Sequence, residues 1–179
     1  MSSYIELLKP RLSATVIFSS LAGYLLAVNS VDLLVLSKLL MGGIFLVGAS
    51  NGLNQVYEVD IDAVMERTKN RPLPTKRITI QSAFIFSLVL GLLGVFCLAM
   101  INFRCAFFGA LSSLIYVVGY TPLKTTTPIS GFIGALPGAM PFMLGWVAVT
   151  NRFSLETGIL FAIQFLWQFP HFWSIAWVR

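Results

Sequence analysis

The chain has 179 residues, of which 57% are hydrophobic and only 11% are charged, and its mean hydropathy is +0.84. A soluble domain carries roughly 25% charged residues, so this composition excludes an ordinary soluble protein and indicates a polytopic membrane protein. The net charge of +5 is explained by membrane orientation rather than by nucleic-acid binding, because the basic residues form no stripe interleaved with aromatic ones. At ~20 residues per span, the length accommodates about six transmembrane helices in one domain.

The first predicted span covers residues 12–28 and follows two basic residues, Lys9 and Arg11. Its length and the further apolar stretches behind it favour a retained helix over a cleaved secretory signal. The second predicted span runs from about residue 39 into a charged stretch. Gly42, Gly48 and Gly52 give it a face of small residues, which is typical of close helix packing and would otherwise leave room for a substrate.

The charged stretch, residues 54–77, places acidic residues before basic ones. If the helix continues through Asp62, then Asn54, Glu58 and Asp62 share one face, ~6 Å apart along the axis. Two carboxylates and a carboxamide are suitable ligands for Mg²⁺ with diphosphate, and the bases that follow would neutralise phosphate charge. The alternative is a solvated loop that only fixes topology. We favour a site because the acids lie on the membrane side of the bases, where an unpaired carboxylate is costly.

The next two spans, residues 80–101 and 106–120, contain no charged residue and predict scaffold helices. Cys97 and Cys105 lie in or beside them without metal-site or disulfide spacing, which indicates packing. A turn-rich loop that contains Lys124 follows; by itself it is a connection with one orienting lysine.

The last two spans, residues 129–149 and 155–178, carry the remaining polar and helix-bending signals. Pro137 and Pro141 predict that the fifth helix bends or breaks, so that it either lines a cavity or is a kinked packing helix. In the sixth helix, polar side chains form one stripe, which a membrane tolerates only toward the bundle interior. This stripe consists of Gln164, Gln168 and His171.

The distribution of basic residues predicts the orientation. Nine of them fall on one side of the predicted membrane: Lys9, Arg11, Arg67, Lys69, Arg71, Lys76, Arg77, Lys124 and Arg179. Only Lys38, Arg104 and Arg152 fall on the other side. The positive-inside rule therefore places the N-terminus, the charged stretch and the Lys124 loop in the cytoplasm.

Residues 54–62 resemble the first Asp-rich motif, N-x-x-x-D-x-x-x-D, of the UbiA superfamily of intramembrane prenyltransferases. Asn54 and Asp62 match it, and Glu58 stands where Asp is usual. The continuation through residue 74 resembles the protoheme IX farnesyltransferase (haem O synthase) branch more closely. Other segments that resemble this branch are residues 8–11, 23–27, 134–146 and 167–173.

The resemblance implies an all-α, polytopic UbiA-like bundle, with about six of about nine transmembrane helices present in residues 1–179. It implies Mg²⁺-dependent farnesyl transfer from farnesyl diphosphate to a vinyl group of haem B, giving haem O for haem-copper oxidases. The expected location is the bacterial cytoplasmic (inner) membrane. Because the chain ends at Arg179, where the branch's second Asp-rich motif would begin, we expect an incomplete domain with weak or no activity.

The resemblance also implies roles for individual residues. The expected ligands of Mg²⁺ and diphosphate are Asn54, Glu58, Asp60 and Asp62. The expected phosphate-binding residues are Arg67, Lys69, Arg71, Tyr120 and Lys124, with Lys124 counted as catalytic beside Asn54, Glu58 and Asp62. Gln168 and His171 are expected to contact the haem, the histidine at the iron or at a propionate.

Two other functions fit the sequence. One is a UbiA-type prenyltransferase that acts on an aromatic quinone precursor, and the other, from a different class, is a small membrane transporter. Acids clustered at one mouth and the lack of an inverted repeat argue against transport. The sequence does not indicate an oligomeric state.

Overall fold

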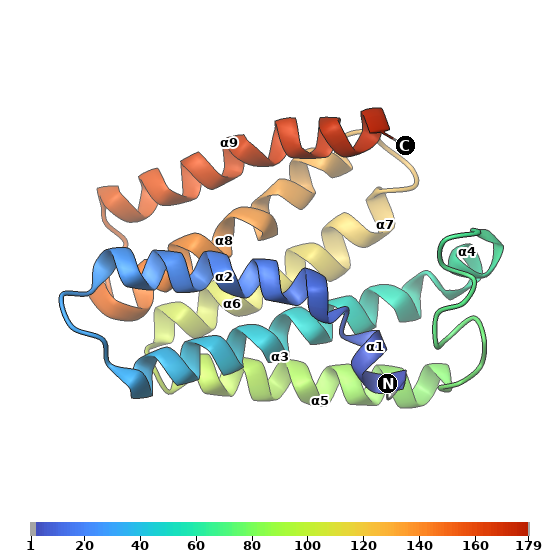
Figure 1. Cartoon of the computed structure of the whole chain (residues 1–179), viewed down its shortest axis with the longest axis horizontal. Helices are drawn as coiled ribbons and strands as arrows, with labels where there is room; N and C mark the ends of the chain where they lie inside the picture. Colours follow the sequence, from blue (N-terminus) through green and yellow to red (C-terminus); the bar gives the residue numbers. More distant parts are fainter. Residues whose placement is uncertain (1–2, 179) are drawn as a thin grey trace.

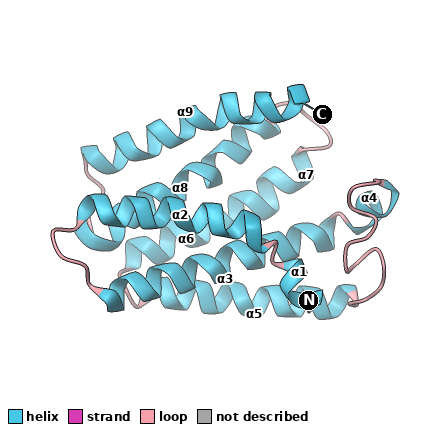
Figure 2. Ribbon diagram, viewed as in Figure 1, coloured by secondary structure: helices cyan, strands magenta, loops and turns pink. Residues whose placement is uncertain are grey.

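The computed structural model describes residues 3–178, in which all regular structure is helical (Figure 2). The helices, in chain order, are α1 (Ser3–Leu7), α2 (Pro10–Ala27), α3 (Leu33–Tyr57), α4 (Val59–Val64), α5 (Ile80–Ala99), α6 (Phe103–Leu114), the π-helix η1 (Ile115–Tyr120), α7 (Thr121–Leu123), α8 (Ser130–Thr150) and α9 (Leu155–Val178). Figure 1 shows the long helices side by side, with α4 and its loop at one end. The most extensive contacts join α3 to α5, α2 to α8 and α8 to α9.

Among the described residues, four helical segments are long and apolar enough to cross a membrane. They are Leu33–Tyr57, Ile80–Ala99, Phe103–Leu123 and Ser130–Thr150. Helices α2 and α9, of 18 and 24 residues, complete the same bundle. The all-α membrane bundle is therefore confirmed. The second span begins six residues earlier than predicted because Asp32 caps α3, accepting hydrogen bonds from the backbone N–H groups of Leu34 and Val35.

Small residues bring the helices into close contact. A Cβ added at Gly145 would overlap the Ser20 carbonyl oxygen, and one at Gly23 would overlap the Phe142 carbonyl oxygen, so the α2 and α8 backbones touch. The predicted packing role of the small face on α3 is confirmed at Gly52, where a Cβ would overlap the Ser87 hydroxyl.

Helix α8 runs without a break through both of its prolines. Pro141 has no N–H to donate, so it leaves the Pro137 carbonyl without its helical partner. The Ser112 hydroxyl, on α6, donates to that carbonyl at 3.4 Å. A neighbouring helix thus satisfies a backbone group that lipid could not.

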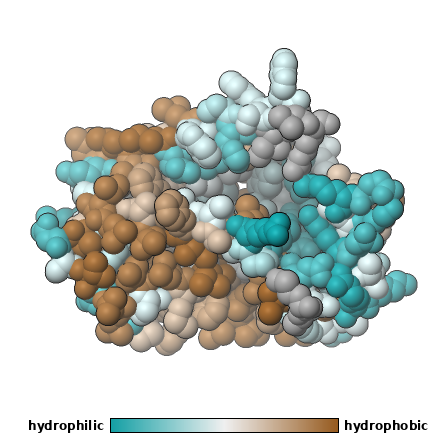
Figure 3. Space-filling view, in the orientation of Figure 1, coloured by the Kyte–Doolittle hydropathy of each residue, from teal (hydrophilic) through white to brown (hydrophobic). Residues whose placement is uncertain are grey.

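Hydropathy divides the visible surface along the long axis. In Figure 3, hydrophobic residues cover most of one side, whereas hydrophilic residues gather at the end where Figure 1 places α4. The chain is therefore a multi-pass membrane protein with a strongly polar end.

Candidate functional site

A cavity of about 600 Å³ opens at this polar end and is lined by most of the predicted ionic residues. We call it the polar cavity. Its charged lining residues are Lys9, Glu58, Asp62, Arg67, Arg71 and Lys124. Segments from α1–α2, α3–α4 and η1–α8 therefore converge on one volume.

The three motif residues that the sequence predicted to share a face do so in spite of a break in the helix. Helix α3 ends at Tyr57, and Glu58 departs from helical geometry with φ −100° and ψ 11°. The hydrogen bonds continue, from Glu58 N–H to Asn54 O at 3.0 Å and from Asp62 N–H to Glu58 O at 2.8 Å. All three side chains are buried, with 2% to 4% exposure. The predicted spacing holds, but the helix is interrupted where it leaves the bundle.

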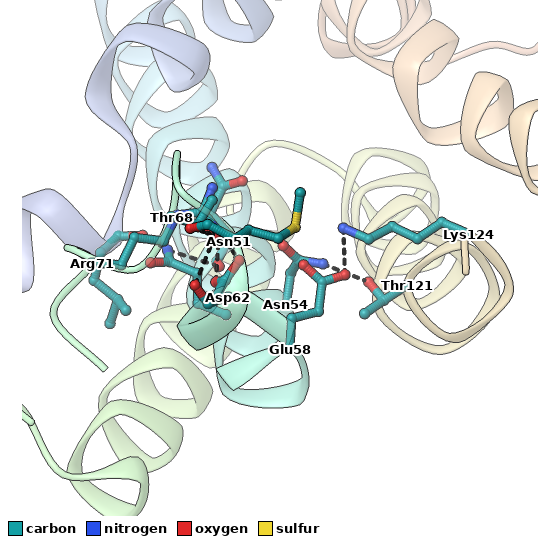
Figure 4. A network of polar contacts seen from close by, with 11 residues as sticks. Asn51, Asn54, Glu58, Asp62, Thr68, Arg71, Thr121 and Lys124 are labelled. Atoms are coloured by element: carbon teal, nitrogen blue, oxygen red, sulfur yellow. Dashed lines mark hydrogen bonds and ion pairs between the residues drawn. The ribbon is translucent and has the colours of Figure 1, made fainter. Parts of the chain in front are cut away.

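Each buried carboxylate is paired with a base (Figure 4). Arg71 Nη1 donates to both Asp62 carboxylate oxygens, at 2.6 and 2.8 Å. Lys124 forms an ion pair with Glu58 Oε1, although this oxygen accepts no hydrogen bond of regular geometry. The pairing offsets the cost of burying these charges.

Hydrogen bonds connect the loop after α4 to Asp62, and they connect the end of the π-helix η1 to Asn54. The Thr68 hydroxyl donates to the Asp62 carbonyl at 3.0 Å, which folds the basic loop back on α4. Asn54 Nδ2 donates to Thr121 Oγ1 at 3.2 Å, and this hydroxyl donates to the Tyr116 carbonyl at 2.9 Å. Asn54 thus ties α3 to the end of η1, a helix type that is often found at functional sites.

Three predicted residues lie at the edge of this arrangement. Asp60 is exposed and does not line the cavity, so its predicted role as a ligand stays a prediction. Lys69 is exposed and pairs with Glu66 at 2.6 Å, whereas Arg67 is exposed but lines the cavity. The described residues contain no group of three or more His, Cys, Asp or Glu side chains placed to hold a metal.

Sequence reasoning assigned Lys9 no place in the site: it counted Lys9 toward the membrane orientation and within residues 8–11, which resemble the farnesyltransferase branch. Lys9 lies between α1 and α2, and it lines the polar cavity. Burial, followed by repulsion from Arg71 and Lys124, lowers its pKa from 10.5 to about 8, against the opposing effect of Glu58 and Asp62. The Lys-Pro dipeptide in front of an apolar helix was the available signal, but nothing in it specified a cavity.

A second cavity, of about 740 Å³, lies among the helices and is mainly apolar. We call it the apolar cavity. It shares lining residues with the polar cavity: Leu12, Tyr116, Tyr120 and Phe172. The two tyrosine rings lie 5.3 Å apart at this junction. The charged cavity and the apolar cavity therefore adjoin each other at these tyrosines.

The predicted polar stripe of α9 lines the apolar cavity through Gln164, Gln168 and His171. Gln168 is 8% exposed and packs on Gly138, where an added Cβ would lie 2.8 Å from its amide nitrogen. The His171 ring stacks on Trp167 with centroids 4.8 Å apart. Polar groups are thus placed inside an otherwise apolar chamber.

The donor set of the polar cavity suits a hard divalent cation. Glu58 and Asp62 supply buried carboxylates, and the Asn54 amide nitrogen donates to Thr121, which leaves the amide oxygen available to a cation. Mg²⁺ in proteins uses one or two carboxylates together with water and substrate phosphates. Two carboxylates are therefore enough for a metal that arrives with a diphosphate.

The fold and the site together define a multi-pass membrane helix bundle in which a charged cavity adjoins an apolar one, an arrangement that suits an amphiphile with an anionic head. The model of the UbiA prenyltransferase family matches residues 16–179, and the chain belongs to this family. The resemblance that the sequence motifs indicated is thereby confirmed.

Comparison with individual members of the family places the chain more narrowly within it. The chain is 52% identical over 177 residues to the protoheme IX farnesyltransferase of Christiangramia forsetii, covering 99% of this chain and 59% of that protein. A structure of digeranylgeranylglyceryl phosphate synthase superposes with a TM-score of 0.83 at 25% identity, covering 92% of this chain and 58% of the other. An Archaeoglobus fulgidus UbiA homologue bound to GPP and Mg²⁺ gives 0.73 at 16% identity, covering 95% and 62%. The chain spans about 60% of the length of the curated relatives it matches.

Proposed function

We propose that this chain supplies the diphosphate-binding and prenyl-binding part of a protoheme IX farnesyltransferase. The observation that carries the proposal is the junction of the two cavities at Tyr116 and Tyr120. A farnesyl diphosphate can place its anionic head among the bases and its hydrocarbon tail in the apolar cavity. The 52% identity to a protoheme IX farnesyltransferase supports haem B as the acceptor.

In this proposal the bases bind the diphosphate. Arg71, Lys124 and Arg67 all line the polar cavity. Charge-assisted hydrogen bonds from such groups are about twice as strong as neutral ones. These groups would orient the head so that the reacting carbon lies at the tyrosine junction.

The reaction breaks the bond between the farnesyl C1 and the diphosphate oxygen, which leaves with the electron pair. Mg²⁺, held by Asn54, Glu58 and Asp62, would supply positive charge that stabilises this leaving group. The vinyl group of haem B provides the electrons of the new carbon–carbon bond. Water then adds to the resulting cation and loses a proton, giving the hydroxyethylfarnesyl group of haem O.

The residues of this chain contribute by binding and by excluding water. The apolar cavity walls keep water from the allylic cation before the carbon–carbon bond forms. Gln168 and His171 are the polar groups that could contact the porphyrin, through its iron or a propionate. No nucleophilic side chain is required.

The test is product formation by the protein expressed from its whole reading frame. Membranes that contain it are incubated with haem B, farnesyl diphosphate and Mg²⁺, and the porphyrins are analysed by chromatography and mass spectrometry. We expect haem O, and its loss in Asp62→Asn. A prenylated aromatic quinone precursor in place of haem O would overturn the assignment of the acceptor.

We further propose that the polar end faces the cytoplasm of a bacterial cell. The basic residues around the polar cavity support this orientation, because positively charged loops are retained on the cytoplasmic side.

A further inference from the structure

Lys9 has an unusual backbone conformation. It adopts φ 50° and ψ 64°, in the left-handed region, at the residue that precedes Pro10 and begins α2. A residue with a Cβ seldom adopts this region, and such strain persists only where the surrounding structure enforces it.

Three buried side chains enforce it by holding the carbonyls just before Lys9. Gln55 Nε2 donates to the Leu7 carbonyl at 2.7 Å, and Asn51 Nδ2 donates to the Leu8 carbonyl at 3.2 Å. Ser13 Oγ donates to the same Leu8 carbonyl at 2.9 Å. Gln55 and Asn51 are 1% and 2% exposed, so these bonds form away from solvent, where unpaired groups are costly.

The conformation places Lys9 at the wall of the polar cavity, within the field of Arg71, Lys124, Glu58 and Asp62. Arg71 and Lys124 are each paired with a buried carboxylate. Within residues 3–178, the structure gives Lys9 no carboxylate partner. Lys9 is thus a cation that an anion can approach without first breaking an ion pair.

We propose that Gln55 and Asn51 are positioning residues: by holding the Leu7 and Leu8 carbonyls they present Lys9 to the polar cavity, where its ammonium group binds the diphosphate. This rests on the proposed function for the identity of the anion. Gln55 lines neither cavity and acts only through Lys9, whereas Asn51 also lines the apolar cavity, so Gln55 is the residue that the test changes.

The test is a double-mutant cycle on the binding of inorganic pyrophosphate with Mg²⁺, measured by titration calorimetry on the detergent-solubilised chain. Lys9→Met is expected to weaken binding about tenfold or more, because a hydrogen bond to a charged group is lost. Gln55→Met, of similar length but without the donor, is expected to weaken it severalfold. In the Lys9→Met background, Gln55→Met should have no further effect, because the residue it positions is already gone.

Arg11→Met is the matched control, since it removes the same charge from an exposed neighbour outside the cavity lining. It should change the affinity less than twofold. Ser13→Ala removes one of the two donors to Leu8 and serves as a milder variant should Gln55→Met fold poorly, which circular dichroism reports.

Additive effects of the two substitutions, or unchanged affinity in Lys9→Met, would overturn the positioning role while pyrophosphate binding by the unmodified chain upholds the anion site. The absence of pyrophosphate binding by the unmodified chain would overturn both proposals. A non-additive cycle without haem O formation would uphold the positioning role and refute the assigned acceptor.

Discussion

At the scale of single residues, two arginine–carboxylate pairs differ mainly in burial. In the Arg71–Asp62 pair the side chains are 22% and 4% exposed, whereas in the Arg77–Glu6 pair they are 41% and 39% exposed. Arg71→Met should lower the free energy of unfolding by about 3–5 kcal/mol, because it leaves a carboxylate buried without a partner. Arg77→Met should cost at most about 1 kcal/mol. Denaturant unfolding in detergent, followed by tryptophan fluorescence, measures both, and equal losses would contradict the burial argument.

The lowered pKa of Lys9, about 8, predicts a pH dependence with a defined sign. An anion binds the protonated amine, so Lys9's contribution to Mg²⁺-pyrophosphate affinity should fall as pH rises through about 8. Arg71 and Lys124 lower this pKa, and Glu58 and Asp62 raise it, so all four must stay unchanged in the comparison.

Pyrophosphate itself titrates, so the informative quantity is the affinity ratio of the unmodified chain to Lys9→Met at each pH. We expect this ratio to shrink toward one between pH 7 and about 9. Lys9's contribution to folding stability has the opposite slope: between pH 8 and 10.5 the unfolded chain binds more protons, so stability rises with pH. An affinity ratio that is constant between pH 7 and about 9 would contradict the binding of pyrophosphate by a Lys9 ammonium group with a lowered pKa.

At the scale of helices, the crossing of α2 and α8 depends on the absence of side chains. A Cβ at Gly145 would lie 2.8 Å from the Gly23 carbonyl carbon and would overlap the Ser20 carbonyl oxygen. Gly145→Ala should therefore separate the helices and lower the melting temperature by several degrees.

Gly158→Ala is the control, because a Cβ added there meets nothing within 4 Å in the structure. On helix propensity alone it should stabilise α9 by up to ~1 kcal/mol. Equal changes in melting temperature for the two alanine substitutions would show that the α2–α8 backbone contact does not limit stability.

The sequence predicted much of the helical layout and of the acidic motif. Residues 155–178 and the common face of Asn54, Glu58 and Asp62 follow from apolar runs and from helical periodicity, which are local properties. The interruption at Glu58 was not predicted, because it depends on how the loop folds back through Thr68 and Arg71.

The roles of Asn51, Gln55 and Lys9 were also out of reach of sequence reasoning. Asn51 and Gln55 donate to carbonyls more than forty positions away in the chain, and a backbone carbonyl leaves no signature in the residue type that carries it. The left-handed backbone conformation of Lys9 could not be predicted from the sequence either, because lysine does not favour it.

At the scale of the whole molecule, the basic residues around the polar cavity predict that this end faces the cytoplasm. The α2–α3 and α7–α8 connections lie at opposite ends of the bundle (Figure 1), and each contains an exposed residue, Ser30 in the first and Thr126 in the second. In a background without Cys97 and Cys105, Ser30→Cys should react with an impermeant maleimide in intact cells. Thr126→Cys should react only after permeabilisation, and the reverse pattern would invert the topology.

In the proposed function, one chain brings a metal-diphosphate site next to a cavity for the prenyl tail. The most direct measurement is titration calorimetry of farnesyl diphosphate against the purified chain, with Mg²⁺ and with a chelator. We predict binding that requires Mg²⁺, is weakened by Asp62→Asn and is tighter than that of pyrophosphate, since the tail adds buried apolar area. Farnesyl diphosphate binding of equal strength in chelator, or no tighter than that of pyrophosphate, would show that the two cavities do not form one metal-dependent site for a prenyl diphosphate.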